Sequence, residues 1–420
     1  MFYASTWSNL SLKCIIISKM SVKHKVLVVG GGFGGVKAAQ DLSKDHQVSV
    51  TLLSDGSELR YYPTLFHTAT GGSRVNSSIP FSVIFEKYNL SIKKGLAVKL
   101  DRTNRTITTK DGQVLEYDTL VLSLGVVANY FNIDGMEEYS YSIKSQSEAA
   151  RLKKHIHDQL SQTHKPDPNY VVIGAGPSGI ELAGTLPDYI RHVMNRHGLP
   201  ARNVHVDLVE AAPRLLPSFT PAVSRKITRR MKKLGVKVYT NSSVTGLDAN
   251  NLIFKGKPLR SHTVVWTAGV TNNPFYKNNG FVIAARGKVA VNTYLQAEDN
   301  IYVLGDNANT PYSGLAQTAL VDGQFAAKNI KRQIRGKKLS SYIAKMPVNV
   351  IPAGKHWAIV IWGGVVLTGW IGWFLREAAD LIGFNDLETW PKASKQFLSE
   401  FTKDNDCAAC NKAFENHLYW

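Results

Sequence analysis

The sequence has little cysteine and a deficit of acidic residues, and we expect no secretory signal in it, with a weak targeting peptide at residues 1–19 as the alternative. Its three cysteines, Cys14, Cys407 and Cys410, all lie near the termini, which excludes a disulfide framework through the core and indicates a reducing compartment. Residues 1–19 have neither a long apolar segment nor a small-residue cleavage site. With 32 acidic against 50 basic residues, the formal charge is +18, which suits anionic partners or serves general solubility.

The first motif is the stretch KVLVVGGGFGG, residues 25–35. Four apolar β-formers at 26–29 lead directly into Gly30, Gly32 and Gly35, the order of a buried strand, a tight phosphate-binding turn and a helix N-terminus. A helix at 36–42 and a second strand at 48–53 follow, and Asp55 comes twenty residues after Gly35. A ribose-binding carboxylate is typical of that position, so we interpret this unit as a dinucleotide site.

The same strand–turn–helix motif recurs at residues 170–179, after an expected linker at 164–168. A strand at 170–173 leads into Gly174, Gly176 and Gly179, and the next strand, 204–209, ends at Glu210. An acidic residue there accepts ribose hydroxyl groups and repels a 2′-phosphate, which predicts NADH rather than NADPH. Pro187 should bend or interrupt the intervening helix.

Later segments resemble a known family, the type II (non-proton-pumping) NADH:quinone oxidoreductases, which are FAD-dependent enzymes of the pyridine nucleotide-disulfide oxidoreductase-like superfamily. The motifs that carry the resemblance are GGGFGG, Asn129-Tyr130-Phe131, GAGPSGIELAG, VEAAPRLLP, WTAGV, LGDNA and LAQTAL, which occur in this order. The resemblance implies FAD in the first site, NADH in the second and a membrane quinone on the far side of the flavin. It departs at Ser54, where the family usually has its ribose acid, and at Val321, where a second quinone-site glutamine is common.

The resemblance also implies roles for individual residues. Glu181 is expected near the nicotinamide and flavin, Asp306 at the FAD ribityl chain, and Ala316 and Gln317 beside the quinone; we take Glu181 and Gln317 as catalytic. The other expected cofactor-binding residues are Gly30, Gly32, Phe33, Gly34, Gly35, Asp55, Gly125, Gly174, Gly176, Pro177, Ser178, Gly179, Glu210, Ala268, Gly269 and Gly305.

The predicted fold is α/β, with two Rossmann-like dinucleotide-binding domains and a C-terminal membrane-associating segment. We expect an extension at 1–20, absent or disordered, with Met20 as an alternative start; the FAD domain at 21–135 and 273–345; the NADH domain at 136–272; and a C-terminal region at 346–420.

The C-terminal region contains nineteen uncharged residues, 357–375, long enough to consider a membrane span. Gly363-Gly364 divides this run and predicts a β-hairpin, leaving residues 370–384 for an amphipathic helix. We expect an apolar side that contains Trp370, Trp373, Phe374, Leu381 and Phe384, with Arg376, Glu377 and Asp380 away from it. Five of the eight tryptophans lie between 357 and 390, and tryptophan favours membrane interfaces, so we prefer an interfacial anchor to a core helix or a full span.

The expected protein is a monotopic membrane-associated enzyme on the cytoplasmic face. Its expected partners are NADH, a membrane quinone, an anionic lipid surface, to which lysines and arginines between 328 and 338 contribute, and a second copy of the chain as a homodimer. We expect no nucleic acid partner and no metal, and we interpret Cys407-x-x-Cys410 as an incidental pair rather than a metal or redox site. The alternative function is an NADH-oxidising flavoprotein with a binding or sensing role, similar to apoptosis-inducing factor, that uses its positive charge on nucleic acid or another anionic partner.

Overall fold

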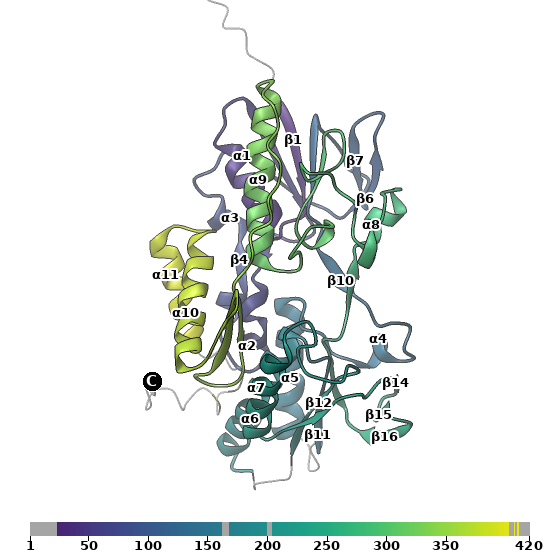
Figure 1. Cartoon of the computed structure of the whole chain (residues 1–420), viewed down its shortest axis with the longest axis vertical. Helices are drawn as coiled ribbons and strands as arrows, with labels where there is room; N and C mark the ends of the chain where they lie inside the picture. The colour runs from purple at the N-terminus through teal and green to yellow at the C-terminus, as the bar shows by residue number, and fades with distance from the viewer. Residues whose placement is uncertain (1–22, 162–167, 200–203, 403–406, 408–409, 411–420) are drawn as a thin grey trace, which may run out of the picture.

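The computed structural model describes residues 23–161, 168–199, 204–402, 407 and 410. The expected extension at 1–20 lies outside these residues, as does most of the expected linker at 164–168. Two lobes are each built on a sheet of mainly parallel strands, and the C-terminal helices lie on the flank of the first lobe (Figure 1).

The first lobe is built on a six-stranded sheet of order β19-β20-β9-β1-β2-β5, in which only the β19–β20 pair is antiparallel. Apolar side chains of its central strands are almost fully buried on both faces, as a parallel sheet requires. Two of its strands come from much later in the sequence than the others. The strands are β1 (His24–Val29), β2 (Val48–Ser54), β5 (Ser91–Lys94), β9 (Thr119–Leu122), β19 (Gln296–Glu298) and β20 (Ile301–Val303).

Two helices of the first lobe, α1 (Phe33–Ser43) and α9 (Ala316–Ile334), pack side by side. A Cβ atom at Gly323 would lie 2.4 Å from the carbonyl oxygen of Gly34, so the absence of a side chain at Gly323 sets how closely the helices approach. The apolar faces of both helices belong to one core cluster with strands β1 and β2.

The second lobe contains a four-stranded parallel sheet of order β13-β12-β11-β17. Its strands are β11 (Asn169–Ile173), β12 (His205–Val209), β13 (Val236–Tyr239) and β17 (Thr263–Trp266), and its helices are α5 (Gln146–Ser161), α6 (Pro177–Arg196) and α7 (Pro221–Lys233). The predicted interruption at Pro187 is wrong, because α6 continues through it. Buried side chains on either side of Pro187, such as Leu186 and Ile190, hold the helix in the core.

Short strands and helices complete the two lobes. Strand β10 (Val126–Ala128) pairs antiparallel with β18 (Val270–Asn272) where the chain passes between the lobes. The remaining strands are β3 (Glu58–Arg60), β4 (Ser78–Pro80), β6 (Ala97–Asp101), β7 (Thr106–Thr109), β8 (Val114–Glu116), β14 (Val244–Leu247), β15 (Asn251–Phe254) and β16 (Lys257–Arg260), and the remaining helices are α2 (Leu65–Ala69), α3 (Phe81–Ile84), α4 (Met136–Tyr139) and α8 (Pro274–Asn278), with 3-10 turns η1 (Tyr62–Thr64), η2 (Val75–Ser77), η3 (Ala285–Gly287), η4 (Gly305–Asn307) and η5 (Ser399–Phe401).

The C-terminal region begins with a three-stranded antiparallel sheet: β21 (Asn349–Pro352), β22 (Ala358–Trp362) and β23 (Val365–Gly369). The predicted hairpin is present, with Trp362 opposite Val365 across Gly363-Gly364. Helices α10 (Trp370–Asn385) and α11 (Trp390–Leu398) follow. Side chains of the sheet, including Ile351 and Ile359, join the core of the second lobe, whereas Phe384 of α10 joins that of the first.

Helix α10 has an exposed apolar side and a buried side, but one residue, Phe384, does not lie on the side that was predicted for it. Trp370 and Phe374 are 71% and 62% exposed, and they are separated from Arg376 and Asp380 as predicted. Phe384 does not share their side: it is fully buried and stacks on Tyr61 with ring centroids 4.3 Å apart. Arg376 and Asp380 are buried against the protein, since an Arg376–Asp380 ion pair neutralises them within the helix. A sequence pattern distinguishes two sides of a helix without showing which one contacts the protein.

Among the described residues, no helix has both the length and the hydrophobicity needed to cross a bilayer.

Candidate functional site

The first glycine turn connects β1 to α1. Gly30 has φ +112°, and a Cβ atom there would lie 2.0 Å from the carbonyl oxygen of Ser123. A Cβ at Gly35 would lie 2.0 Å from the Gly30 carbonyl oxygen, so Gly35 lets the helix approach the turn. Gly32 is the N-cap of α1 and has no side-chain cap, and open space surrounds its Cβ position. The first turn therefore offers free helix N–H groups to an anion, as a pyrophosphate requires.

The end of β2 approaches this turn through Ser54. A Cβ at the neighbouring Gly31 would lie 2.7 Å from the Ser54 hydroxyl oxygen, and Ser54 is buried. Asp55 is exposed and forms an ion pair with Arg60 at 3.0 Å. In this arrangement Asp55 stands at the rim of the turn, one residue beyond the position that faces it, so its ribose contact remains a prediction.

A second set of first-lobe residues surrounds Asp306. The Gly305 N–H donates to the buried Asp322 carboxylate at 3.0 Å, and the Tyr342 hydroxyl donates to the same carboxylate at 2.5 Å. Desolvation raises the pKa of Asp322 to about 6, against these two hydrogen bonds. Asp322 thus holds Gly305, which has φ +64°, and positions the next residue, Asp306.

Asp306 lies where charges from both lobes meet. Its half-buried carboxyl group has a pKa raised by desolvation, which the positive charges of Lys288 and Lys144 oppose. Burial lowers the pKa of Lys144, which lies two residues before the second-lobe helix α5, and the negative charge of Asp306 opposes this shift. A carboxylate in this position can accept hydrogen bonds from sugar-alcohol hydroxyl groups.

Gly125 is held by a side chain that sequence reasoning did not identify. Its N–H donates to the Asn307 side-chain oxygen at 2.9 Å, and the Asn307 amide donates back to the Gly125 carbonyl at 2.7 Å. The same amide donates to the Asn272 side chain at 2.6 Å. Asn307 therefore joins the segment between β9 and β10 to strand β18. The only sequence signal for Asn307 was its place in LGDNA, directly after Asp306.

The second glycine turn repeats the geometry of the first between β11 and α6. Gly174 has φ +99°, and a Cβ there would lie 2.5 Å from the Cα of Ala268. A Cβ at Gly179 would lie 1.8 Å from the Gly174 carbonyl oxygen, and open space surrounds the Cβ position of Gly176, the N-cap of α6. Pro177 and Ser178, the first two helical residues, are exposed.

Glu210 directly follows β12 and lies beside the second turn. Its carboxylate accepts hydrogen bonds from the Ala175 N–H at 2.7 Å and from the Ala212 N–H at 2.8 Å. The predicted ribose acid therefore lies directly at the glycine turn, unlike Asp55.

The WTAGV motif forms a turn after β17. The Asn129 N–H donates to the Gly269 carbonyl at 3.1 Å, and the Trp266 indole donates to the Asn129 carbonyl at 3.1 Å. A Cβ at Gly269 would lie 2.6 Å from the ring of Phe131. Two sequence motifs far apart in the chain, Asn129-Tyr130-Phe131 and WTAGV, thus pack together beside the second turn.

Glu181 lies on α6, soon after the second glycine turn. Desolvation raises the pKa of its half-buried carboxyl group to about 8, against the positive charge of Arg376. Arg376 comes from α10, and its guanidinium donates to the Pro63 carbonyl at 3.1 Å. The positive charge of Arg376 on α10 therefore acts on Glu181 although the two residues are far apart in the sequence, and Glu181 can hold a proton near neutral pH.

Ala316 and Gln317 are the first two residues of α9. Gln317 is exposed, and its side-chain oxygen accepts a hydrogen bond from the Val348 N–H at 3.3 Å. Gln317 thus connects the start of α9 to the segment that leads into the C-terminal sheet.

Comparisons with known proteins show the family of this chain and several proteins similar to it. The model of the pyridine nucleotide-disulphide oxidoreductase family matches residues 24–323. Proteins called type II NADH:quinone oxidoreductase are similar to this chain: that of Staphylococcus saprophyticus is 27% identical and that of Staphylococcus haemolyticus 26%, each over 85% of this chain and 94% of the relative.

Solved structures show the same fold. NDH2 from Plasmodium falciparum, solved in complex with NADH, matches with TM-score 0.79 and 18% identity over 90% of this chain and 98% of that one. The sulfide:quinone oxidoreductase from Aquifex aeolicus matches with TM-score 0.74 and 20% identity over 93% and 98%.

Proposed function

We propose that this chain, which belongs to the pyridine nucleotide-disulphide oxidoreductase family, is an FAD-dependent NADH:quinone oxidoreductase. The observation that carries the proposal is the pair of glycine turns, each with an open Cβ position at the helix N-cap, at Gly32 and at Gly176. Nothing lies within 4 Å of a Cβ atom at either position, so a pyrophosphate can approach the backbone there. The names of the curated relatives and their coverage support the quinone as acceptor.

Each glycine turn binds one of the two cofactors. We assign FAD to the first lobe and NADH to the second, because Glu210 would repel a 2′-phosphate at the second turn. Bound FAD would accept a hydride from NADH and supply two electrons to the quinone. The proposed FAD contacts are Gly30, Gly32, Phe33, Gly34, Gly35, Asp55, Gly125, Gly305 and Asp306, and the proposed NADH contacts are Gly174, Gly176, Pro177, Ser178, Gly179, Glu210, Ala268 and Gly269.

The protein contributes binding, orientation and proton placement. Glu181 holds a proton at its carboxyl group near neutral pH, so it can act as the local donor when the quinone takes up protons. Ala316 and Gln317 present the N-terminus of α9, where its N–H groups and dipole favour a partial negative charge on a quinone oxygen. Disulfide chemistry at the flavin is not available to this chain, because no cysteine occurs between Cys14 and Cys407.

We propose that the C-terminal region attaches the enzyme to a lipid surface without crossing it, at the cytoplasmic face. Large apolar side chains are exposed on the hairpin and on both C-terminal helices, an arrangement that suits the headgroup boundary. They are Trp362, Val365, Trp370, Ile371, Phe374, Ile382, Trp390 and Leu398. The lysine and arginine cluster of residues 328–338 lies at the opposite end of α9, away from this apolar surface (Figure 1), so the attachment does not depend on it. A homodimer remains part of the proposal.

Stopped-flow absorbance tests the activity directly. NADH should bleach the flavin absorbance of the anaerobic enzyme, and a short-chain quinone mixed in second should restore it rapidly. Flavin that NADH reduces but quinone fails to reoxidise would favour the sensing alternative, and salt-dependent retention on DNA would support it.

Vesicle flotation tests the attachment. Trp370→Glu with Phe374→Glu should release the protein from vesicles while flavin stays bound, because both side chains point outward. Val282→Glu is the matched control, since Val282 is 73% exposed on the first lobe, outside the apolar surface. Binding that survives the double substitution would overturn this attachment.

A further inference from the structure

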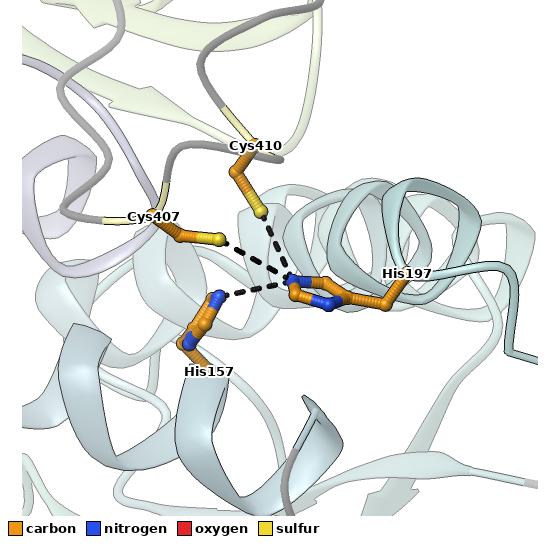
Figure 2. A group of neighbouring side chains, drawn as sticks. All are labelled: His157, His197, Cys407 and Cys410. Atoms are coloured by element: carbon orange, nitrogen blue, oxygen red, sulfur yellow. Dashed lines mark hydrogen bonds between the residues drawn. The ribbon is translucent and has the colours of Figure 1, made fainter.

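Four side chains gather where the end of the chain meets the second lobe (Figure 2). His157 lies on α5, and His197 is the C-cap of α6. Cys407 and Cys410 come from beyond α11 and complete the group. One potential ligand atom from each side chain lies within 4.8 Å of the three others.

Hydrogen bonding does not account for the contacts of this group. The Nε2 atom of His197 lies 3.2 Å from His157 Nε2, 3.5 Å from the Cys407 sulfur and 3.6 Å from the Cys410 sulfur. One imidazole nitrogen carries either a single proton or a single acceptor lone pair, so it can satisfy one of these three neighbours. Three ligand-type atoms converging on one nitrogen indicate a shared centre between them.

The distances match the edges of a tetrahedral zinc site. With Zn–N and Zn–S bonds of about 2.0–2.1 Å and 2.3 Å, ligand atoms are separated by about 3.3 Å for two nitrogens and about 3.6 Å for nitrogen and sulfur. The observed values of 3.2, 3.5 and 3.6 Å fall on these edges. Cys407-x-x-Cys410 also has the spacing of a zinc knuckle.

The second ring nitrogen of His157 has the surroundings of a metal ligand. Its Nδ1 lies 3.3 Å from the Asp158 carboxylate and 3.4 Å from the Ser161 hydroxyl. Metal-bound histidines commonly donate this N–H to a carboxylate, which orients the ring and leaves Nε2 to the metal. Cys410 is fully buried, and the other three ligands are half-buried, so the centre is largely shielded from water.

We propose that His157, His197, Cys407 and Cys410 bind one Zn²⁺ in a closed, structural site. Each cysteine loses its thiol proton on binding, and the two thiolates balance the charge of the metal. The proposal replaces the interpretation of the cysteines as an incidental pair.

The site would fasten the end of the chain to the second lobe. Helices α10 and α11 pack on the first lobe, for example through a hydrogen bond from the Gln40 side chain to the Leu387 carbonyl at 2.9 Å. The zinc centre would attach the residues that follow α11 to α5 and α6 of the second lobe. It is remote from the flavin chemistry, since α6 separates His197 from the second glycine turn by about 30 Å.

Metal analysis of the full-length holoenzyme tests the proposal. Protein purified through a tag without histidine, from zinc-supplemented medium, should carry about one zinc per chain by mass spectrometry. Cys407→Ser and His197→Asn should each lower the zinc content by at least about tenfold. Cys14→Ser and His46→Asn are matched controls that should keep it. A parent protein without bound zinc, or ligand variants that retain it, would overturn the proposal.

Two further measurements guard against misfolded variants and against a disulfide. Flavin content should be unchanged in the ligand variants, whereas trypsin cleavage after Lys403, which lies between α11 and Cys407 in the sequence, should become faster, because the segment beyond α11 loses its attachment. Added Co²⁺ should give the intense visible bands of a tetrahedral thiolate site in the zinc-stripped parent and not in Cys407→Ser. A Cys407–Cys410 disulfide in protein whose thiols were blocked before lysis would also overturn the site.

Discussion

The two glycine turns share a backbone geometry but differ in how the protein surrounds them. Phe33 and Gly34, at the start of α1, are buried, and α9 packs against the turn from a distant part of the sequence. Pro177 and Ser178, at the start of α6, are exposed. An enclosed turn suits a cofactor that stays bound, and an exposed one suits a substrate that must leave after every turnover. The difference therefore lies in the surroundings of the motif rather than in the motif.

We expect the largest effect from substitutions that block one glycine turn at a time, because they distinguish the cofactor that each turn binds. Gly32→Val and Gly176→Val place a side chain in open space at extended backbone, so both proteins should fold. Gly32→Val should yield a colourless protein without flavin. Gly176→Val should keep its flavin, while its reduction by NADH slows by at least about tenfold, a loss of 1.4 kcal/mol or more.

Flavin absorbance of the purified proteins and stopped-flow reduction provide the measurements, with circular dichroism as the check on folding. Loss of flavin from Gly176→Val would contradict the assignment of FAD to the first turn and NADH to the second, since it would mean that the turns do not bind separate cofactors.

The next largest effect distinguishes flavin reduction by NADH from flavin reoxidation by quinone. Gln317→Ala should slow flavin reoxidation by quinone about tenfold and leave reduction by NADH nearly unchanged. Gln324→Ala, an exposed glutamine on the same helix, is the control. Equal slowing of both half-reactions would place Gln317 in flavin binding or folding instead.

Nucleotide preference tests the acids beside the two turns. Glu210→Gln removes the charge that faces the second turn, so the ratio of kcat/KM for NADH over NADPH should fall about tenfold. Asp55→Asn should leave this ratio unchanged and alter only the retention of flavin, because Asp55 stands at the rim of the other turn. An unmutated enzyme that uses NADPH as well as NADH would refute the role of Glu210.

The smallest expected effect is a pH dependence from Glu181. Its folded-state pKa of about 8 exceeds the ordinary value of 4.5, so the folded protein binds more protons than the unfolded chain between these values, and stability falls as pH rises through this window. Glu181→Gln should flatten that fall in thermal unfolding. Quinone reduction by the parent should decline above about pH 8, and Glu181→Gln should remove that decline.

Glu138→Gln, an exposed glutamate, should reproduce the parent in both experiments. A parent whose unfolding temperature and quinone reduction do not change between pH 6 and 9 would show that Glu181 is not the proton-holding group.

The sequence predicted what is local and missed what joins distant segments. Strand, turn and helix in each glycine unit follow from neighbouring residues, and so does the Gly363-Gly364 hairpin. Asn307, which holds Gly125, and Arg376, which faces Glu181, were missed because their partners lie far away in the chain. The cysteines seemed isolated for the same reason: His157 and His197 precede them by more than two hundred residues. Helix periodicity predicted two sides for α10 but placed Phe384 on the wrong one.

The discontinuous first sheet has a consequence for how the protein is made. Strand β20 pairs with β9, with Ile301 opposite Leu120, so this sheet is incomplete until the ribosome has passed the whole second lobe. The second sheet uses only residues 169–266 and can form earlier. During synthesis one edge of β9 stays unpaired until β20 has been translated. An unpaired strand edge can pair with other chains, so we expect chaperones to bind the nascent chain during this interval.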